Sequence, residues 1–464
     1  MSQAARQFEQ DAARVAADAP LRAFLQRTLL KYQETRAKQQ ASFQDWPAAR
    51  QAAAEAKWEA INHLDQYLEQ FEANLIRRGA QVHWARHGEE ARAIILDLLR
   101  QRRARTIIKS KSMATEEIHL NDALAAAGFE VIESDLGEYI CQLKQEPPYH
   151  LVFPAMHLSR EQISDLFHAK LGSERTSNPE ELTLVARRVL RQKYVQADAG
   201  ITGANFAVAE TGMISITENE GNARLTAALP RLMITLVGIE KVLPRFDDLA
   251  LLLPMLATAG TGQPLTCYNS QYSGRRQPGE CDGPEEFHVI LLDNHRTALL
   301  ADAEQRDALH CIRCGACLNI CPIFRNVGGH TYGTTYGGPI GSVITPHLRG
   351  LVEWKHLSSA SSLCGACSET CPVKIDIHHH LLHNRRNAQE RHPAGWERTA
   401  FRLFAWVANS PSLWQFVLEL ARFFDPLVRR LRGTRLDPLR PWTATRDLPA
   451  PAPESFKEWW RRRA

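Results

Sequence analysis

Two cysteine runs constrain this chain more than any other feature. Both place thiols two residues apart and then close with a three-residue gap, a cysteine and a proline. Thiolates at the short spacing can wrap one face of a cubane, whereas the cysteine beyond the longer gap points away into the next segment. The proline then opens a helix or turn without needing an amide donor. This pattern is typical of proteins that hold a pair of iron–sulfur clusters. The runs are Cys311-x2-Cys314-x2-Cys317-x3-Cys321-Pro322 and Cys364-x2-Cys367-x3-Cys371-Pro372.

In runs of this kind the last cysteine ligates the cluster of the other run. We therefore predict two 4Fe–4S clusters whose ligand sets cross between the runs. The predicted ligands of cluster 1 are Cys311, Cys314, Cys317 and Cys371, and those of cluster 2 are Cys321, Cys364 and Cys367.

The second run is one ligand short, because Ser361 occupies the position of its first cysteine. Three interpretations stay open. Cluster 2 is a 3Fe–4S cluster, or a 4Fe–4S cluster with serine, water or substrate as fourth ligand, or it takes a thiol from elsewhere in the chain. The other cysteines are Cys141, Cys267 and Cys281.

Zinc sites and disulfides are the alternatives for these thiols. Zinc motifs usually read as two separated C-x2-C pairs, unlike the longer first run. Ten cysteines in 464 residues, seven of them in two short runs, are also too sparse and too clustered for a disulfide framework. Both alternatives are therefore disfavoured.

Composition limits the partners and the location. The net charge of +4 arises from interspersed acids and bases, which gives no electrostatic case for nucleic acid. The N-terminal residues are polar and lack the apolar core of a secretory signal. The most apolar stretch, residues 401–420, contains Arg402, Glu419 and a polar break and falls short of a membrane span. We expect a cytoplasmic protein.

Periodicity divides the chain into four predicted regions. Residues 1–78 have apolar residues at helical spacing, and residues 79–295 alternate short apolar runs with helical segments, which predicts an α/β domain with a mostly parallel sheet. Residues 296–390 carry the cysteine runs after a predicted helix at 296–309, with a glycine-rich loop at 328–341. Residues 391–464 are helical and rich in Trp and Arg. The predicted strands are 80–85, 105–110, 130–133, 206–209, 213–217, 232–237 and 287–292.

The C-terminal region leaves two interpretations open. It docks on a partner or a membrane surface, or it packs as a helical hairpin on the cluster region. The glycine-rich loop likewise shapes the surroundings of the clusters or a docking face, or is packed linker.

Several segments resemble the lactate utilization protein B family, the iron–sulfur subunit of a three-protein bacterial system that oxidises L-lactate. The resemblance spans nearly the whole chain, and the seven cysteines match position for position, including the missing eighth. Its markers are residues 109–117 (KSKSMATEE), 202–206 (TGANF), 210–212 (ETG), 217–222 (TENEGN), the loop 328–341 and both cysteine runs.

The resemblance implies a lactate-utilization (LUD) domain for the α/β region, similar in fold to ribose-5-phosphate isomerase and CoA transferases. It implies a helical, ferredoxin-like domain for the two clusters. The implied partners are a cysteine-rich subunit like heterodisulfide reductase and a smaller protein with a LUD domain, through which the chain could also associate with a membrane. The implied function is electron transfer while lactate becomes pyruvate, which allows growth on lactate.

A turn between a predicted strand and helix holds the candidate substrate-binding residues Lys109, Lys111, Ser112 and Thr115. Such turns at the carboxyl edge of a parallel sheet bind anions, although the turn could equally be solvated with a hydroxyl capping the helix. Glu218 resembles, loosely, the nucleophilic glutamate of CoA transferases, but Glu220 breaks that match.

Four histidines, His378, His379, His380 and His383, follow the second run. Consecutive histidines on a helix point in different directions, so a structural role is favoured over metal binding.

Three functions remain: an electron-transfer subunit, an acyl- or CoA-transferring enzyme with structural or regulatory clusters, and a scaffold. No G-x-G-x-x-G opens a helix after a strand, so the sequence carries no flavin or nicotinamide fingerprint. Crossed ligation of two clusters favours electron transfer.

Overall fold

A computed structural model describes residues 2–391, 395–437, 439–443, 446, 449, 452 and 454–463 of the chain. Two compact units make up the chain, Met1–Ala388 and Gln389–Ala464. The first unit contains the sheets and both cysteine runs. The boundaries that we predict within it, at residues 78 and 295, remain a prediction.

A six-stranded parallel sheet forms the centre of the first unit. The order of its strands is β1-β10-β7-β4-β2-β3, and every neighbouring pair is parallel. Strand β7 is buried along its whole length, as expected for a strand covered by helices on both faces. The mostly parallel sheet of the predicted α/β fold is therefore confirmed. The strands are β1 Gln81–Ala85, β2 Thr106–Lys109, β3 Glu130–Glu133, β4 Ala199–Thr202, β7 Leu232–Gly238 and β10 Glu286–Leu292.

Two of the predicted strands belong instead to a second, four-stranded sheet of order β8-β5-β6-β9. Strands β5 and β6 pair antiparallel, so assigning these two runs to the parallel sheet was wrong. Only four residues join β5 to β6, and a parallel crossover needs a dozen or more. The strands are β5 Phe206–Val208, β6 Met213–Glu218, β8 Val242–Leu243 and β9 Tyr268–Tyr272.

The predicted helix at 296–309 is interrupted. It forms α13, Arg296–Leu300, and a separate 3-10 turn η2, Arg306–His310. Between them the side chain of Asp302 accepts a hydrogen bond from the backbone amide of Glu304 at 3.0 Å. Aspartate competes in this way with helical hydrogen bonds and ends the helix early.

Helices cover the parallel sheet and extend from it. They are α5 Gly88–Gln101, α6 Met113–Glu117, α7 Leu120–Ala126, α8 Leu136–Lys144, α9 Arg160–Leu171, α10 Pro179–Gln196, α11 Asn222–Ala228 and α12 Asp248–Thr261, with the 3-10 turn η1 at Ile239–Lys241. Gly200 in β4 allows α11 to approach closely, because a Cβ there would lie 2.1 Å from the carbonyl oxygen of Thr226.

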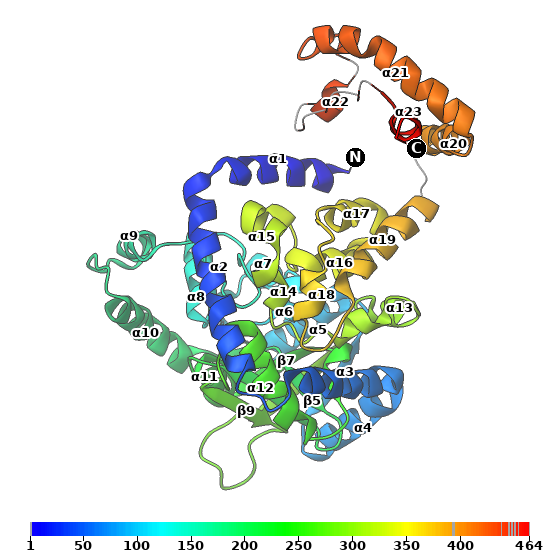
Figure 1. Ribbon diagram of the computed structural model, residues 1–464. Coiled ribbons are helices and arrows are strands. Elements are labelled where there is room, and N and C mark those ends of the chain that lie inside the picture. The colour runs from blue at the N-terminus through cyan, green and yellow to red at the C-terminus, as the bar shows by residue number, and fades with distance from the viewer. Residues whose placement is uncertain are drawn as a thin grey trace. The chain divides into compact units, whose positions relative to one another are not determined.

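The four N-terminal helices contact both the sheets and the cluster region. In Figure 1 the blue helices α1 and α2 run beside α15 in yellow-green, which they contact. The guanidinium of Arg50 donates to the carbonyl of Cys371 at 2.9 Å, and Arg36 donates to the hydroxyl of Thr370. The helices are α1 Gln3–Ala17, α2 Ala19–Gln40, α3 Trp46–Asn62 and α4 Leu64–Arg77.

The cluster region is helical, in agreement with the predicted fold. Its glycine-rich loop is packed tightly: a Cβ on Gly329 would lie 1.7 Å from the carbonyl oxygen of Tyr149. Buried Asn384 joins neighbouring helices by donating to the carbonyl of Val343 at 3.0 Å. The elements are α14 Ala316–Ile320, α15 Pro322–Val327, η3 His330–Tyr332, α16 Gly338–Arg349, α17 Leu351–Ser359, α18 Ala366–Thr370 and α19 Ile377–Arg391.

Most of the described residues of the second unit lie in helices. Phe404 of one helix meets Trp414 of the next edge to face, with ring centroids 6.1 Å apart. Among the described helices of the whole chain, none is long and apolar enough to cross a membrane. The helices of this unit are α20 Gly395–Ala408, α21 Pro411–Leu431, α22 Arg440–Thr443 and α23 Phe456–Arg461.

Candidate iron–sulfur centres and the adjoining cavity

The two cysteine runs fold into the same backbone shape. Gly315 and Gly365 each precede a short helix, α14 and α18, in the left-handed conformation, with φ of 76° and 80°. Each helix ends at an extended cysteine, Cys321 and Cys371, with nearly equal dihedral angles. The two short helices contact one another. The two runs therefore form a structural repeat, and its two copies contact one another.

The structure brings Cys371 of the second run to the cysteines of the first. Burial raises the pKa of the Cys371 thiol, and the nearby Cys314 and Cys311 raise it further. Cys311, Cys314, Cys317 and Cys371 also line one small hollow. This grouping is the one that the crossing rule predicts for cluster 1.

The remaining cysteines of the runs form a second group. Burial raises the pKa of Cys367 to about 11, and Cys321 and Cys364 lie close enough to add to that shift. Cys321 belongs to the first run and the other two to the second. The groups adjoin, because Cys367 also influences Cys317.

Backbone amides point at the sulfur atoms in both groups. The amide of Ile375 donates to the sulfur of Cys371 at 3.4 Å, and that of Phe324 donates to Cys321 at 3.5 Å. Hydrogen bonds to ligating sulfur are one of the means by which a protein sets the potential of a cluster.

The thiols suit a multi-iron group better than a single metal ion. Burial raises the pKa of Cys314 to about 12, so this thiol would keep its proton near neutral pH without a cation beside it. One tetrahedral Zn²⁺ holds its sulfur ligands about 3.8 Å apart. Within the described residues, which include all ten cysteines, no three of these sulfurs lie within 4.8 Å of one another. A cluster separates its thiolates because each binds a different iron.

The side of the second group near Cys364 is open to solvent. The hydroxyl of Ser361 accepts a hydrogen bond from the amide of Leu363 at 3.1 Å. The amide of Ala366 and the hydroxyl of Ser362 both lower the pKa of Cys364. Ser362 therefore contacts a cysteine of this group, a position that the spacing argument did not single out.

The other three cysteines lie in the α/β region. Cys141 is buried in α8 and donates its thiol proton to the carbonyl of Pro154 at 3.4 Å. Cys267, directly before β9, and Cys281, between β9 and β10, are exposed. Their predicted role as a fourth ligand stays untested.

Lys109, the first candidate for substrate binding, is enclosed by carboxylates. Its ammonium lies 2.7 Å from Glu133 and 3.1 Å from Glu116, with Glu138 at 3.9 Å. Burial alone would lower the pKa of Lys109, but these carboxylates raise it well above its ordinary value. Thr115 is buried beside it and accepts a hydrogen bond from the same ammonium at 3.2 Å. The side chains of Lys109 and Thr115 are therefore buried, and their contacts stabilise the turn.

The other three candidates line a cavity of about 400 Å³ at the carboxyl edge of the parallel sheet. Lys111 donates to the carbonyl of Val152 at 3.0 Å, and the hydroxyl of Ser112 caps α6. The carboxylate of Glu218 accepts hydrogen bonds from the amides of Ala223 and Arg224, at the start of α11. Glu218 is therefore engaged as a helix cap, and burial raises its pKa.

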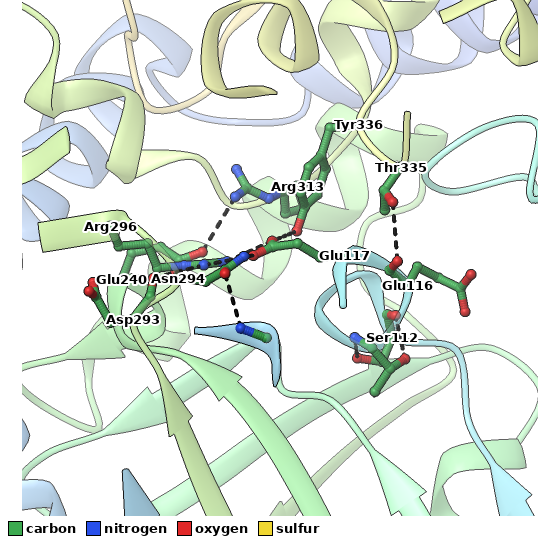
Figure 2. A network of polar contacts seen from close by, with 12 residues as sticks. Ser112, Glu116, Glu117, Glu240, Asp293, Asn294, Arg296, Arg313, Thr335 and Tyr336 are labelled. Carbon is green, nitrogen blue, oxygen red and sulfur yellow. Dashed lines mark hydrogen bonds and ion pairs between the residues drawn. The ribbon is translucent and has the colours of Figure 1, made fainter. Parts of the chain in front are cut away.

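A buried ionic network closes the inner end of the cavity and joins the sheet to the cluster region (Figure 2). Arg296 pairs with Glu117 at 2.8 Å and with Glu240, and Tyr336 donates to Glu117 at 2.6 Å. Arg313, which lies between two cluster-run cysteines, reaches Glu240 at 3.4 Å. Sequence reasoning did not single out these residues. The sequence did contain one signal for them, because charged residues, beginning with Glu240, follow the apolar strand β7.

The charges of this network shift the pKa values of both its acidic and its basic members. Burial alone would raise the pKa of Glu240, but Arg296 and Arg313 lower it to about 2. Burial and the neighbouring Arg313 lower the pKa of Lys241 to about 8. Lys241 lines the cavity together with Arg313 and Cys314.

The four histidines pair locally. His379 and His378 lie 2.6 Å and 3.1 Å from the carboxylate of Asp376, and the three could gather around a cation. His380 is buried and contacts Asp307 at 2.7 Å. His383 packs on the ring of His380.

Three family descriptions match successive parts of the chain. Residues 68–292 match "LUD domain", residues 307–375 match "4Fe-4S dicluster domain", and residues 378–464 match "Lactate utilisation protein B, C-terminal". The cluster region is thus an iron–sulfur domain of the 4Fe–4S type.

Curated relatives carry the name "Lactate utilization protein B". The protein of Bacillus velezensis is 45% identical over 427 residues, 91% of this chain and 89% of its own length. That of Shouchella clausii is 45% identical over 90% of this chain and 89% of its own length. That of Lysinibacillus sphaericus is 43% identical over 96% and 94%. The chain is also similar, at 17% identity and a TM-score of 0.28, to the crystal structure of a DUF162 family protein from Deinococcus radiodurans, with 49% of this chain and 98% of that chain covered. By the identity and coverage of these relatives, the chain belongs to the lactate utilization protein B family.

Proposed function

We propose that this protein is the electron-transferring iron–sulfur subunit of a system that oxidises L-lactate to pyruvate. The observation that carries the proposal is the gathering of seven cysteines into two adjoining groups, each built from both runs. Such clusters, when bound, accept and release single electrons. The chain's own residues bury the thiols, donate amides to their sulfurs and place Arg313 beside Cys311.

The grouping of the cysteines and the family membership support a more specific proposal. Two clusters are held with crossed ligands, the second with an incomplete thiolate set. The partners are the cysteine-rich subunit and the smaller LUD protein, in the cytoplasm, with contact to a membrane through them. The helix-capping role of Glu218 disfavours acyl transfer, because a nucleophilic carboxylate must be free to attack.

Protein purified without oxygen should contain about seven to eight irons per chain and visible charge-transfer absorption. Combined with its partner subunits it should reduce a one-electron dye when L-lactate is added. Metal analysis and dye reduction measure these results. Stoichiometric zinc without iron, or lactate oxidation at the full rate by the partners alone, would contradict the proposal.

We expect Ser361→Cys to complete the ligand set of cluster 2 and shift its reduction potential, because thiolate would replace a weaker or exchangeable ligand. Electron paramagnetic resonance on the oxidised protein is the measurement. A three-iron signal in the wild type should vanish in the variant, while Ser359→Cys, at an exposed position at the end of α17, is the control and should keep the signal. Identical spectra and identical growth on lactate would place Ser361 away from iron.

A further inference from the structure

The cavity at the carboxyl edge of the parallel sheet extends from the LUD domain to the cluster region. Its walls come from the turns after β2, β4 and β7, from α12, and from the loop that carries the first cysteine run. A volume of about 400 Å³ holds a small organic molecule and the waters around it. Its lining includes Ser112, Asn205, Lys241, Arg313, Tyr336 and Cys314.

Two cations with unused donors lie at the inner end of this cavity. The Nε and Nη1 atoms of Arg313 are buried without a hydrogen-bond partner, and its guanidinium lies over the ring of Tyr336 with 4.7 Å to the centroid. In the described part of the chain, no hydrogen bond or ion pair within 4.0 Å engages the ammonium of Lys241.

The carboxylates of the neighbouring ionic network do not supply the missing partner. The carboxylates of Glu117 and Glu240 face Arg296, which binds both of them, as Figure 2 shows. Counting Lys241, Arg296 and Arg313 against these two carboxylates leaves one positive charge. Buried donors without acceptors are costly, and a carboxylate can accept from a guanidinium and an ammonium together.

The rest of the cavity wall is polar and carries charges of both signs, namely Lys111 and the carboxylates of Asp135, Glu218 and Glu220. Ser112 offers a hydroxyl. Asn205 also lines the cavity, and its side-chain oxygen accepts a hydrogen bond from the amide of Thr217 at 2.9 Å. Groups of this type bind a hydroxyl substituent. The cavity therefore combines anion recognition at one end with hydrogen-bonding groups at the other.

We propose that this cavity binds a small organic acid whose carboxylate lies between Lys241 and Arg313, against the loop that carries Cys314. The site itself follows from the cavity and its cations, and only the identity of the ligand as a 2-hydroxy acid rests on the proposed function. The LUD domain of this chain is then a substrate-binding domain adjoining the first cysteine group.

Equilibrium dialysis of labelled L-lactate against the anaerobically purified protein, with iron content verified, tests the proposal. Saturable binding is expected for the wild type, and Lys241→Met should weaken it about 10- to 100-fold, because a hydrogen bond to a charged group is lost. Lys241→Arg should retain binding. Lys170→Met, which removes the same charge from an exposed position on α9, should bind as the wild type does. Lactamide, which lacks the negative charge, should not compete.

The outcomes separate this inference from the proposed function. Equal affinities of Lys241→Met and wild type overturn the site, as does an iron-loaded wild type that does not bind lactate. Neither result touches the electron-transfer proposal. A lower affinity in Lys241→Met with unchanged iron content supports the site. Unchanged affinity with a shifted cluster potential would assign both cations to balancing the charge of the cluster and would also overturn it.

Discussion

Lys109→Met is expected to destabilise the parallel sheet by about 3–5 kcal/mol, because it leaves buried carboxylates without their cation. The ammonium lies 2.7 Å from Glu133, which is 3% exposed, and 3.1 Å from Glu116. Thermal unfolding of the whole protein and hydrogen exchange of the amides in β2 and β3 measure the effect.

Lys193→Met is the matched control. Its ammonium pairs with Glu130 at 2.5 Å, but both side chains are partly exposed, and such pairs contribute about 1 kcal/mol or less. Equal losses of stability in the two variants would show that the buried charges around Lys109 are compensated in another way.

Cys371→Ser is expected to remove the cluster held by Cys311, Cys314 and Cys317, although it belongs to the other run. Its sulfur lines the hollow of the first group. About half of the iron should be lost, together with one of two paramagnetic signals, while Cys364→Ser should remove the other signal. Metal analysis and electron paramagnetic resonance of the reduced proteins measure both.

Cys267→Ser, at an exposed cysteine directly before β9, is the control and should keep all the iron, because the proposed clusters take their thiolates from the two runs alone. Loss of the same signal in Cys371→Ser and Cys364→Ser would mean that each run serves its own cluster.

The sequence predicted the parts of the fold that local patterns encode. Buried strands such as β7 and β10 are continuous apolar runs, and the runs of cysteines have a spacing that few other structures require. Strand β4 was missed because Ala and Gly fill the first half of its four residues, Ala199–Thr202, which leaves only Ile201 and Thr202 to favour a strand. The pairing of β5 with β6 was readable from the four-residue connection.

The candidate site was less predictable, because its charges come together only in the folded chain. Lys109 follows a strand and precedes a helix, which is also where anions bind. Nothing local indicates that Glu133 and Glu138, more than twenty residues further on, surround it. Arg313 was overlooked for a different reason. The cysteines on either side of it already accounted for the function of its segment.

The hydrogen bond from Arg50 to the carbonyl of Cys371 spans 321 residues of sequence. At a synthesis rate of about 5–20 residues per second, helix α3 leaves the ribosome roughly 15–60 s before this partner exists. During that interval α3 lacks the loop around Cys371 that Arg50 contacts in the folded protein. In the crossed arrangement that we propose, iron loading of the first group needs both runs and is therefore confined to the last stage of biosynthesis. A ribosome that stalls before residue 371 would then release a chain unable to complete it.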